Sequence, residues 1–147
     1  MMYHSEAIVR PMYHRKQLNL NSTPRGTAVT ELAICLPLLV LITLGTVEAC
    51  SMLYLQQKLE TAAYEGSRVG CVPDATAANV RYQCETLLDA QSVNDYVITL
   101  NPSDPASLQQ GEFLRVSIEA PCNTNSVIGG WFYMGRLLSG DASLSKE

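Results

Sequence analysis

A glycine and a carboxylate stand at a fixed spacing in front of the longest apolar run of the chain. Gly26 follows Arg25, and Glu31 comes five residues after Gly26, immediately before the uncharged run 32–47. Glycine lets another polypeptide approach the backbone closely, as a membrane protease must. A carboxylate at the mouth of a membrane-length helix is costly in lipid and is stabilised by a cation. Gly26 is therefore a place where the backbone can be approached closely, and Glu31 is a carboxylate that needs a cation.

Both residues also have simpler explanations. Gly26 can be an ordinary loop glycine, and Glu31 can complement the positive end of a helix dipole. The sequence offers no catalytic set, because its only histidines, His4 and His14, precede Gly26. It contains no C-x-x-C motif, no glycine-rich phosphate loop and no cluster of carboxylates. We expect no catalytic residue, no cofactor and no metal ligand, and we predict that the chain is not an enzyme.

The charge of the chain is divided between a basic leader and an acidic remainder. Residues 1–26 carry four basic and one acidic residue, a net charge of +3, whereas the whole chain carries −4 and the remainder therefore −7. Basic residues in front of an apolar span tend to stay in the cytoplasm. We expect a cytoplasmic leader over residues 1–26 and an acidic part outside. An acidic exterior argues against nucleic-acid binding, which requires a basic face.

A single long helix is predicted over residues 27–70. Its first part, about 28–47, is apolar enough to span a membrane, which takes roughly 20 residues. Residues 48–70 contain no proline, and their apolar positions recur every three or four residues as a stripe. We expect this stripe to pack on the sheet of the same chain, with filament contacts as a secondary role. We expect Glu48 to be an interfacial carboxylate just outside the lipid. The stripe consists of Leu55, Leu59, Ala62, Gly66 and Val69.

The remaining residues, 71–147, predict a small extracytoplasmic α+β domain. A second helix is expected over about 75–90, capped by Asp74 or Thr76. Three segments have the two-residue alternation of strands and predict a small antiparallel sheet of about three strands. These segments are 96–100, 113–120 and the neighbourhood of Ala142 and Leu144.

Residues 131–138 are amphipathic, and their structure is ambiguous from the sequence. Trp131, Phe132 and Tyr133 form an aromatic group that can belong to the core or its rim, or to a membrane-interface or partner patch. We favour the core or rim, which is the usual place of aromatic side chains.

Five cysteines are present, two of them, Cys35 and Cys50, within or just after the apolar run. The other three, Cys71, Cys84 and Cys122, are expected in an oxidising compartment, where one intramolecular disulfide would leave one cysteine over. We favour Cys71 with Cys84, which flank a turn and the first half of the second helix. The other pairings stay open, because sequence alone does not determine connectivity.

The first half of the chain resembles a known family. The spacing from Gly26 to Glu31 is typical of class III prepilins. Residues 36–48, 54–57 and 62–68 are similar to the TadE-like (TadE/TadG) proteins, which are pseudopilins of the tight-adherence, or Flp-type, pilus system. The resemblance is dense over about residues 25–72. The ending 137–144 is more loosely similar to the last strand of the family.

This resemblance implies a type IV pilin-like fold and a role in assembly. A prepilin peptidase would cut between Gly26 and Thr27, and Glu31 would pair with the freed Thr27 amine of a neighbouring subunit. The implied protein is a minor pseudopilin that passes once through the bacterial inner membrane, with its N-terminus cytoplasmic and its C-terminal domain periplasmic or extracellular. The implied partners are the peptidase, other pilins and pseudopilins, the pilus assembly platform and inner-membrane lipid.

Two other functions are compatible with parts of the sequence. An uncleaved signal-anchor protein would carry a small periplasmic interaction or ligand-binding domain. A secreted enzyme would use the apolar run as the h-region of a signal peptide, which is 7–15 residues long. The run 32–47 is longer than that, and an amphipathic helix continues after it without an evident cleavage site. We therefore rank the secreted enzyme below the signal anchor.

Overall fold

The computed structural model describes residues 25–130 and 132–146. The basic leader as far as residue 24, including both histidines, lies outside the described residues, and so does Trp131. The chain divides into two units, which meet between Leu36 and Pro37. Secondary structure begins with a long helix and continues with a second helix and three strands.

The first helix, α1, runs from Arg25 to Gly70 and contains Pro37 in its interior. Its later part presents one buried face, at positions that recur every three or four residues as a 3.6-residue helix requires. The predicted stripe is confirmed at four of its positions, whereas Val69 is only half-buried and Gly70 is buried in its place. The buried residues of this face are Met52, Leu55, Leu59, Ala62, Ala63, Gly66, Ser67 and Gly70.

The second helix, α2, spans Ala77–Ala90. Thr76 is its N-cap, and the threonine hydroxyl accepts a hydrogen bond from the backbone N–H of Asn79 at 3.3 Å. This bond gives a partner to one of the backbone amides that have none inside the helix at its start. Of the two predicted caps, Asp74 and Thr76, the structure therefore shows Thr76. The buried face of α2 consists of Val80, Cys84 and Leu88.

Three antiparallel strands form one sheet in the order β1-β2-β3. They are β1 (Val97–Asn101), β2 (Phe113–Pro121) and β3 (Leu137–Ser145). A 3-10 turn, η1 (Pro105–Ser107), lies between β1 and β2, and a short helix, α3 (Cys122–Asn125), follows β2. The predicted α+β class with about three strands is confirmed.

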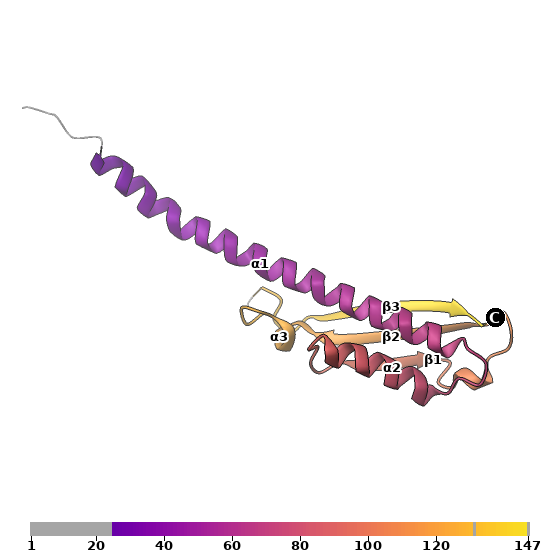
Figure 1. Ribbon diagram of the computed structural model, residues 1–147. Coiled ribbons are helices and arrows are strands. Elements are labelled where there is room, and N and C mark those ends of the chain that lie inside the picture. Colours follow the sequence, from indigo (N-terminus) through magenta and orange to yellow (C-terminus); the bar gives the residue numbers. More distant parts are fainter. Residues whose placement is uncertain (1–24, 131, 147) are drawn as a thin grey trace, which may run out of the picture. The chain divides into compact units, whose positions relative to one another are not determined.

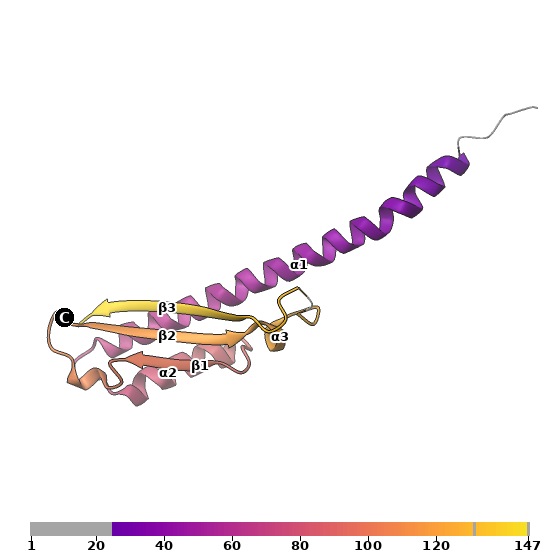
Figure 2. The ribbon, with the colours of Figure 1, turned by 180° about the vertical axis from the view of Figure 1, so that it is seen from behind.

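The later part of α1 and the whole of α2 cover one face of this sheet, and the other face is open (Figures 1 and 2). Buried and exposed residues alternate along β2, which explains why the helices cover only one face of the sheet. Its buried residues, Leu114, Val116, Ile118 and Ala120, face the helices, and the residues between them face outward. On the open face Arg115 of β2 pairs with Asp141 of β3 at 3.5 Å. The core is therefore the layer between the two helices and the sheet.

Two glycines set how closely the layers approach. Gly66 of α1 lies where a side chain would overlap the sulfur of Cys84 on α2. Gly140 of β3 lies against the backbone of α1 at Leu59 and Glu60, which a methyl group on this glycine would overlap. Gly140 lies on the edge strand β3 and pairs with Ile118 of the central strand, so α1 approaches the sheet closely at this edge.

The structure does not contain the predicted disulfide between Cys71 and Cys84. Cys84 is fully buried between α2 and α1, and its thiol donates to the carbonyl of Ala62 at 3.5 Å. Cys71 follows the end of α1 and lines a surface cavity with Tyr64 and Leu144. The two cysteines are not bonded because the Cys84 side chain lies in the helix–helix contact at Gly66, whereas Cys71 lies beyond the end of α1.

The buried thiol of Cys84 predicts a loss of stability at alkaline pH. Burial raises its pKa from 9.0 to about 11, and the Glu85 carboxylate adds to the rise. Because the folded pKa lies above the unfolded one, the stabilisation is complete below pH 9 and is lost as the pH rises to about 11. A shift of this size corresponds to on the order of 2 kcal/mol. The free energy of unfolding, measured with urea, should therefore fall more steeply with pH between these values for the native chain than for Cys84→Ala. Equal slopes for the two proteins would contradict this prediction.

Candidate functional site

Gly26 and Glu31 lie in the first turns of α1, where the sequence predicts cleavage and ion pairing. The Thr30 hydroxyl donates to the carbonyl of Gly26 at 2.6 Å, one turn back along the helix. Nothing described lies within 4 Å of the place where a Gly26 side chain would be. Glu31 is exposed, and among the described residues it has no ion-pair partner. Among the described residues, therefore, none covers either of the two predicted site residues.

The apolar run that follows is also uncovered. Among the described residues, one helical segment, Gly26–Gly70, is long and apolar enough to cross a membrane by length and composition. None of its most apolar 18-residue window is buried within the protein. Ile34 and Leu38, for example, are 75% and 61% exposed. A row of exposed aliphatic side chains is typical of a helix that meets lipid or other apolar helices.

Glu48, just after the run, was expected to be an interfacial carboxylate just outside the lipid, and in the structure it is fully buried by protein. The Ser126 hydroxyl donates to its Oε1 atom at a long 3.5 Å. Its Oε2 atom has no hydrogen-bond partner within the described part of the chain. Burying a carboxylate in this way is costly, so its cover must be stabilised by other contacts.

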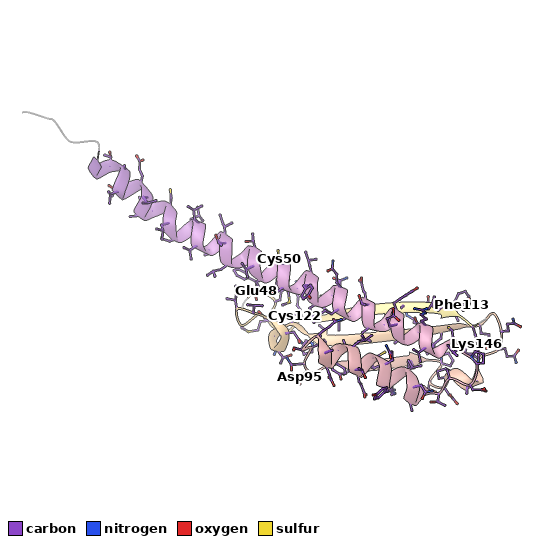
Figure 3. All side chains as sticks on the ribbon, in the orientation of Figure 1. Glu48, Cys50, Asp95, Phe113, Cys122 and Lys146 are labelled. Atoms are coloured by element: carbon purple, nitrogen blue, oxygen red, sulfur yellow. The ribbon has the colours of Figure 1, made fainter. Side chains whose placement is uncertain are left out.

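The cover of Glu48 is the connection between α3 and β3. Residues Ile128 and Phe132 of this connection line a cavity of about 450 Å³ together with Glu48 and an apolar row on α1. The α1 residues of the cavity are Pro37, Val40, Leu41 and Leu44. Figure 3 shows Glu48 and Cys122 at this end of the sheet, and Phe113 and Lys146 at the opposite end.

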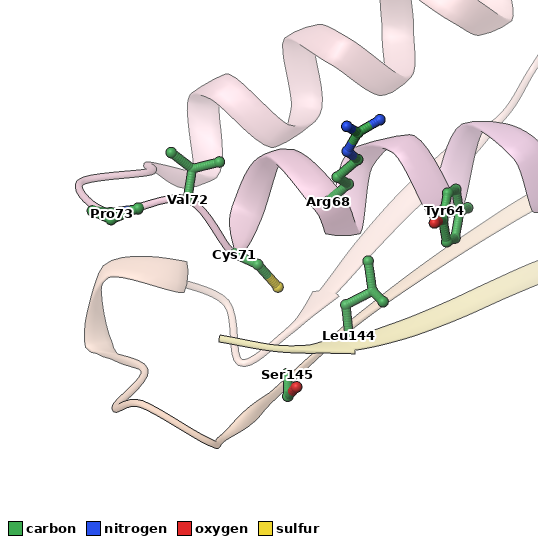
Figure 4. Close-up of a pocket in the computed structure, with 7 residues that line it drawn as sticks. All are labelled: Tyr64, Arg68, Cys71, Val72, Pro73, Leu144 and Ser145. Atoms are coloured by element: carbon green, nitrogen blue, oxygen red, sulfur yellow. The ribbon is translucent and has the colours of Figure 1, made fainter. Parts of the chain in front are cut away.

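A second cavity lies near the C-terminal end of α1. It measures about 560 Å³ and is lined by side chains from α1, the turn after it and β3 (Figure 4). Among the described residues that line it, Arg68 is the charged one, and this side chain lies 4.0 Å from Glu65 on the same helix. The described residues contain no group of three or more histidine, cysteine, aspartate or glutamate side chains that could hold a metal ion.

A comparison with protein families shows what the helical segment is similar to. The family model described as TadE-like protein matches residues 26–68. Over this segment the chain is similar to the TadE-like family. The family is associated with the Tad pilus and is structural, with an N-terminal apolar helix. No curated protein and no solved structure matches the chain.

The TadE-like match begins at Gly26 and ends within the amphipathic part of α1. It therefore contains both predicted assembly residues and the apolar run, and it confirms the resemblance seen in the sequence. The second helix and the sheet lie beyond the matched residues. Within the match, a candidate membrane span is consistent with a membrane-anchored Tad component.

Two features of the structure could not be predicted from local sequence patterns. Burial of Glu48 depends on Ser126, 78 residues further along the chain, and no local pattern records that contact. Phe132, which we expected in the core or at its rim, is 58% exposed. The sequence also allowed an aromatic patch at a membrane interface. The lack of carboxylates in residues 120–140 is the sequence signal in favour of that alternative.

Proposed function

We propose that this TadE-like chain is a minor pseudopilin, a structural subunit of a Flp-type tight-adherence pilus or of a related secretion machine. The observation that carries the proposal is the spacing of Gly26 and Glu31 at the start of an exposed apolar helix, inside the matched segment. In this function the protein performs no chemistry of its own. It is a substrate for one cleavage and then a building block.

The cleavage is proposed between Gly26 and Thr27, by a prepilin peptidase at the cytoplasmic side. The first turn of a helix has amides without intrahelical partners, so this turn opens more easily than the helix interior. The open space around Gly26 supports access of a protease to the backbone. Removal of the leader takes away a net charge of +3 and leaves an acidic chain that begins with a free amine at Thr27.

Glu31 is proposed as the residue that sets the register between subunits. Its carboxylate is exposed and lies next to Leu32, the first residue of the apolar run. In a low-dielectric environment such a charge is stabilised by a neighbouring cation, and the freed Thr27 amine of another subunit would supply one. Lateral packing of apolar helices would then bring subunits together with one axial offset.

The proposed location is the bacterial inner membrane, with a single span and the N-terminus in the cytoplasm. The basic leader before the span and the acidic domain after it support this orientation. The partners would be the peptidase, other pilins and pseudopilins, the assembly platform and membrane lipid. The rival, an uncleaved signal anchor with a periplasmic interaction domain, shares this orientation and differs only in keeping the leader.

Intact-mass measurement of membrane-extracted protein separates the two functions. The chain has a mass of 16.1 kDa, and co-expression with a prepilin peptidase should remove the mass of residues 1–26. Replacing Gly26 with valine should prevent the cut, because a branched side chain hinders close approach to the backbone. A matched Ser22→Val change in the leader should leave cleavage intact. Full-length native chain in the presence of an active peptidase would contradict the proposal and favour the signal anchor.

A further inference from the structure

The connection after α3 lies beside residues of the apolar run. Ile128 and Phe132 line one cavity with Pro37, Val40, Leu41 and Leu44 of α1, and the Phe132 ring reaches within 4.0 Å of the side-chain position of Gly45. We call the described residues 126–130 and 132–137 the lip. Because the α1 side of this contact belongs to the span, a bilayer around the span must also reach the lip.

The outward side of the lip is apolar. Val127 is 74% exposed, Met134 is 72% exposed and Leu137 is 65% exposed, in addition to Phe132. A small domain in water rarely leaves so many large apolar side chains uncovered on one short connection. The open face of the sheet, by contrast, carries charged and hydroxyl side chains such as Arg115, Glu119 and Asp141 between its few apolar ones.

The charge of this region also differs from that of the rest of the domain. Residues 120–140 contain one arginine, Arg136, and no carboxylate, although the chain after the leader has a net charge of −7. A surface without carboxylates can approach the anionic headgroups of a bilayer, which the remaining acidic surface cannot do as easily. Aromatic side chains are enriched at the level of those headgroups.

From these observations we infer that the lip is a second membrane-contacting element, which lies in the interfacial region of the bilayer beside the exit of α1. The inference rests on the proposed membrane anchorage of α1. The lip contacts lipid through Val127, Phe132 and Met134, and the domain is thereby held against the membrane surface with a defined side toward it. A single helix alone would leave the domain free to rotate above the bilayer.

Ser126 is the residue that positions the lip. Its hydroxyl oxygen accepts from the backbone N–H of Gly130 at 2.8 Å and of Ile128 at 3.3 Å, and the hydroxyl donates to Glu48. These bonds fold the connection back onto α1. Glu48 is then covered by protein and does not face the lipid, where a carboxylate would be costly. The lip therefore also explains how an acidic residue is tolerated directly after the span.

Depth-dependent fluorescence quenching tests the inference in the full chain. The only tryptophan, Trp131, is first replaced in the double variant Trp131→Phe with Phe132→Trp, so that the probe occupies a described lip position. The matched control is Trp131→Phe with Phe113→Trp. Phe113 is 67% exposed and starts β2, eight residues and ~26 Å of strand from Pro121 at the lip end. Both proteins are reconstituted into vesicles of phosphatidylethanolamine and phosphatidylglycerol containing a brominated phosphatidylcholine.

The probe at position 132 should lose most of its fluorescence to bromine placed high on the acyl chain and should resist aqueous iodide. The probe at position 113 should show the reverse. Equal bromine quenching at the two positions would overturn the inference. Protection of position 132 from both quenchers would also overturn it, because a second protein copy would then be the cover. Vesicle flotation is measured in parallel: a chain that does not float contradicts the membrane anchorage itself, whereas a floating chain with an unquenched lip contradicts the inference alone.

Discussion

Replacing Gly140 with alanine is expected to destabilise the helix–sheet domain severely. The added methyl group would overlap backbone atoms of Leu59 and Glu60 and lie 2.7 Å from the Leu59 Cβ atom. No change of side-chain rotamer relieves a clash with helix backbone, so β3 or α1 must move. Overpacking costs ~1–3 kcal/mol and occasionally more, and we expect the upper end here because the neighbours are rigid. A small domain has ~5–15 kcal/mol of stability in total, so this is a large share of it.

Thermal unfolding of the detergent-solubilised chain, followed by circular dichroism, measures the effect. Since 1 kcal/mol shifts the midpoint of a small domain by roughly 4–8 °C, Gly140→Ala should lower it by on the order of 15 °C. The matched control is Ser139→Ala on the same strand, where the side chain is exposed, and its midpoint should stay within a few degrees of the native chain. A native midpoint for Gly140→Ala would show that β3 does not approach α1 as closely as the structure indicates.

Glu31→Leu is expected to separate processing from assembly. Leucine removes the charge but keeps the apolar character of the helix, so cleavage after Gly26 should continue. Removing one partner of a buried ion pair costs ~3–5 kcal/mol, so incorporation into pilus-associated material should fall by about a hundredfold or more. Intact mass reports the cleavage, and immunoblotting of sheared pili against the membrane fraction reports the incorporation.

Two further variants test whether the charge itself matters. Glu31→Gln keeps the shape of the side chain and should fail in incorporation as Glu31→Leu does. Glu60→Gln removes an exposed carboxylate from the same helix, where its partner is only Gln56 at 3.0 Å, and should incorporate normally. Native incorporation of Glu31→Leu would remove the basis for the register argument while leaving the cleavage proposal untouched.

Much of the fold could be predicted because its signals are local. The alternation of Leu114, Val116 and Ile118 predicted both the strand and its buried face. The three- and four-residue spacing from Leu55 to Gly66 predicted the buried stripe of α1. Alternation predicted the last strand only around Ala142 and Leu144, whereas the family resemblance placed it at 137–144, and the strand spans Leu137–Ser145. Its first residues alternate too weakly in hydrophobicity to reveal a strand, because Gly140 fills the position that faces the helix.

The features of the candidate site were also predictable only where their signals are local. The spacing of Gly26, Glu31 and the apolar run is a property of consecutive residues, and the family match over residues 26–68 agrees with it. The burial of Glu48 could not be predicted, because its cover comes from Ser126 and the connection around it. The Cys71–Cys84 pairing failed for a related reason: proximity along the chain does not state which side chain turns into the core.

From the sequence alone we could predict a basic leader, a long helix that changes from apolar to amphipathic, and an α+β domain after it. Each of these follows from charge, periodicity or spacing within a single segment. Three features became visible only in the tertiary structure. Gly140 lies on the backbone of α1, Glu48 is buried, and an apolar lip lies beside the apolar run of α1. The physical reason is that burial depends on contacts between distant segments. Gly26 and Glu31 are different, because the protein leaves them uncovered and their proposed partners are other molecules.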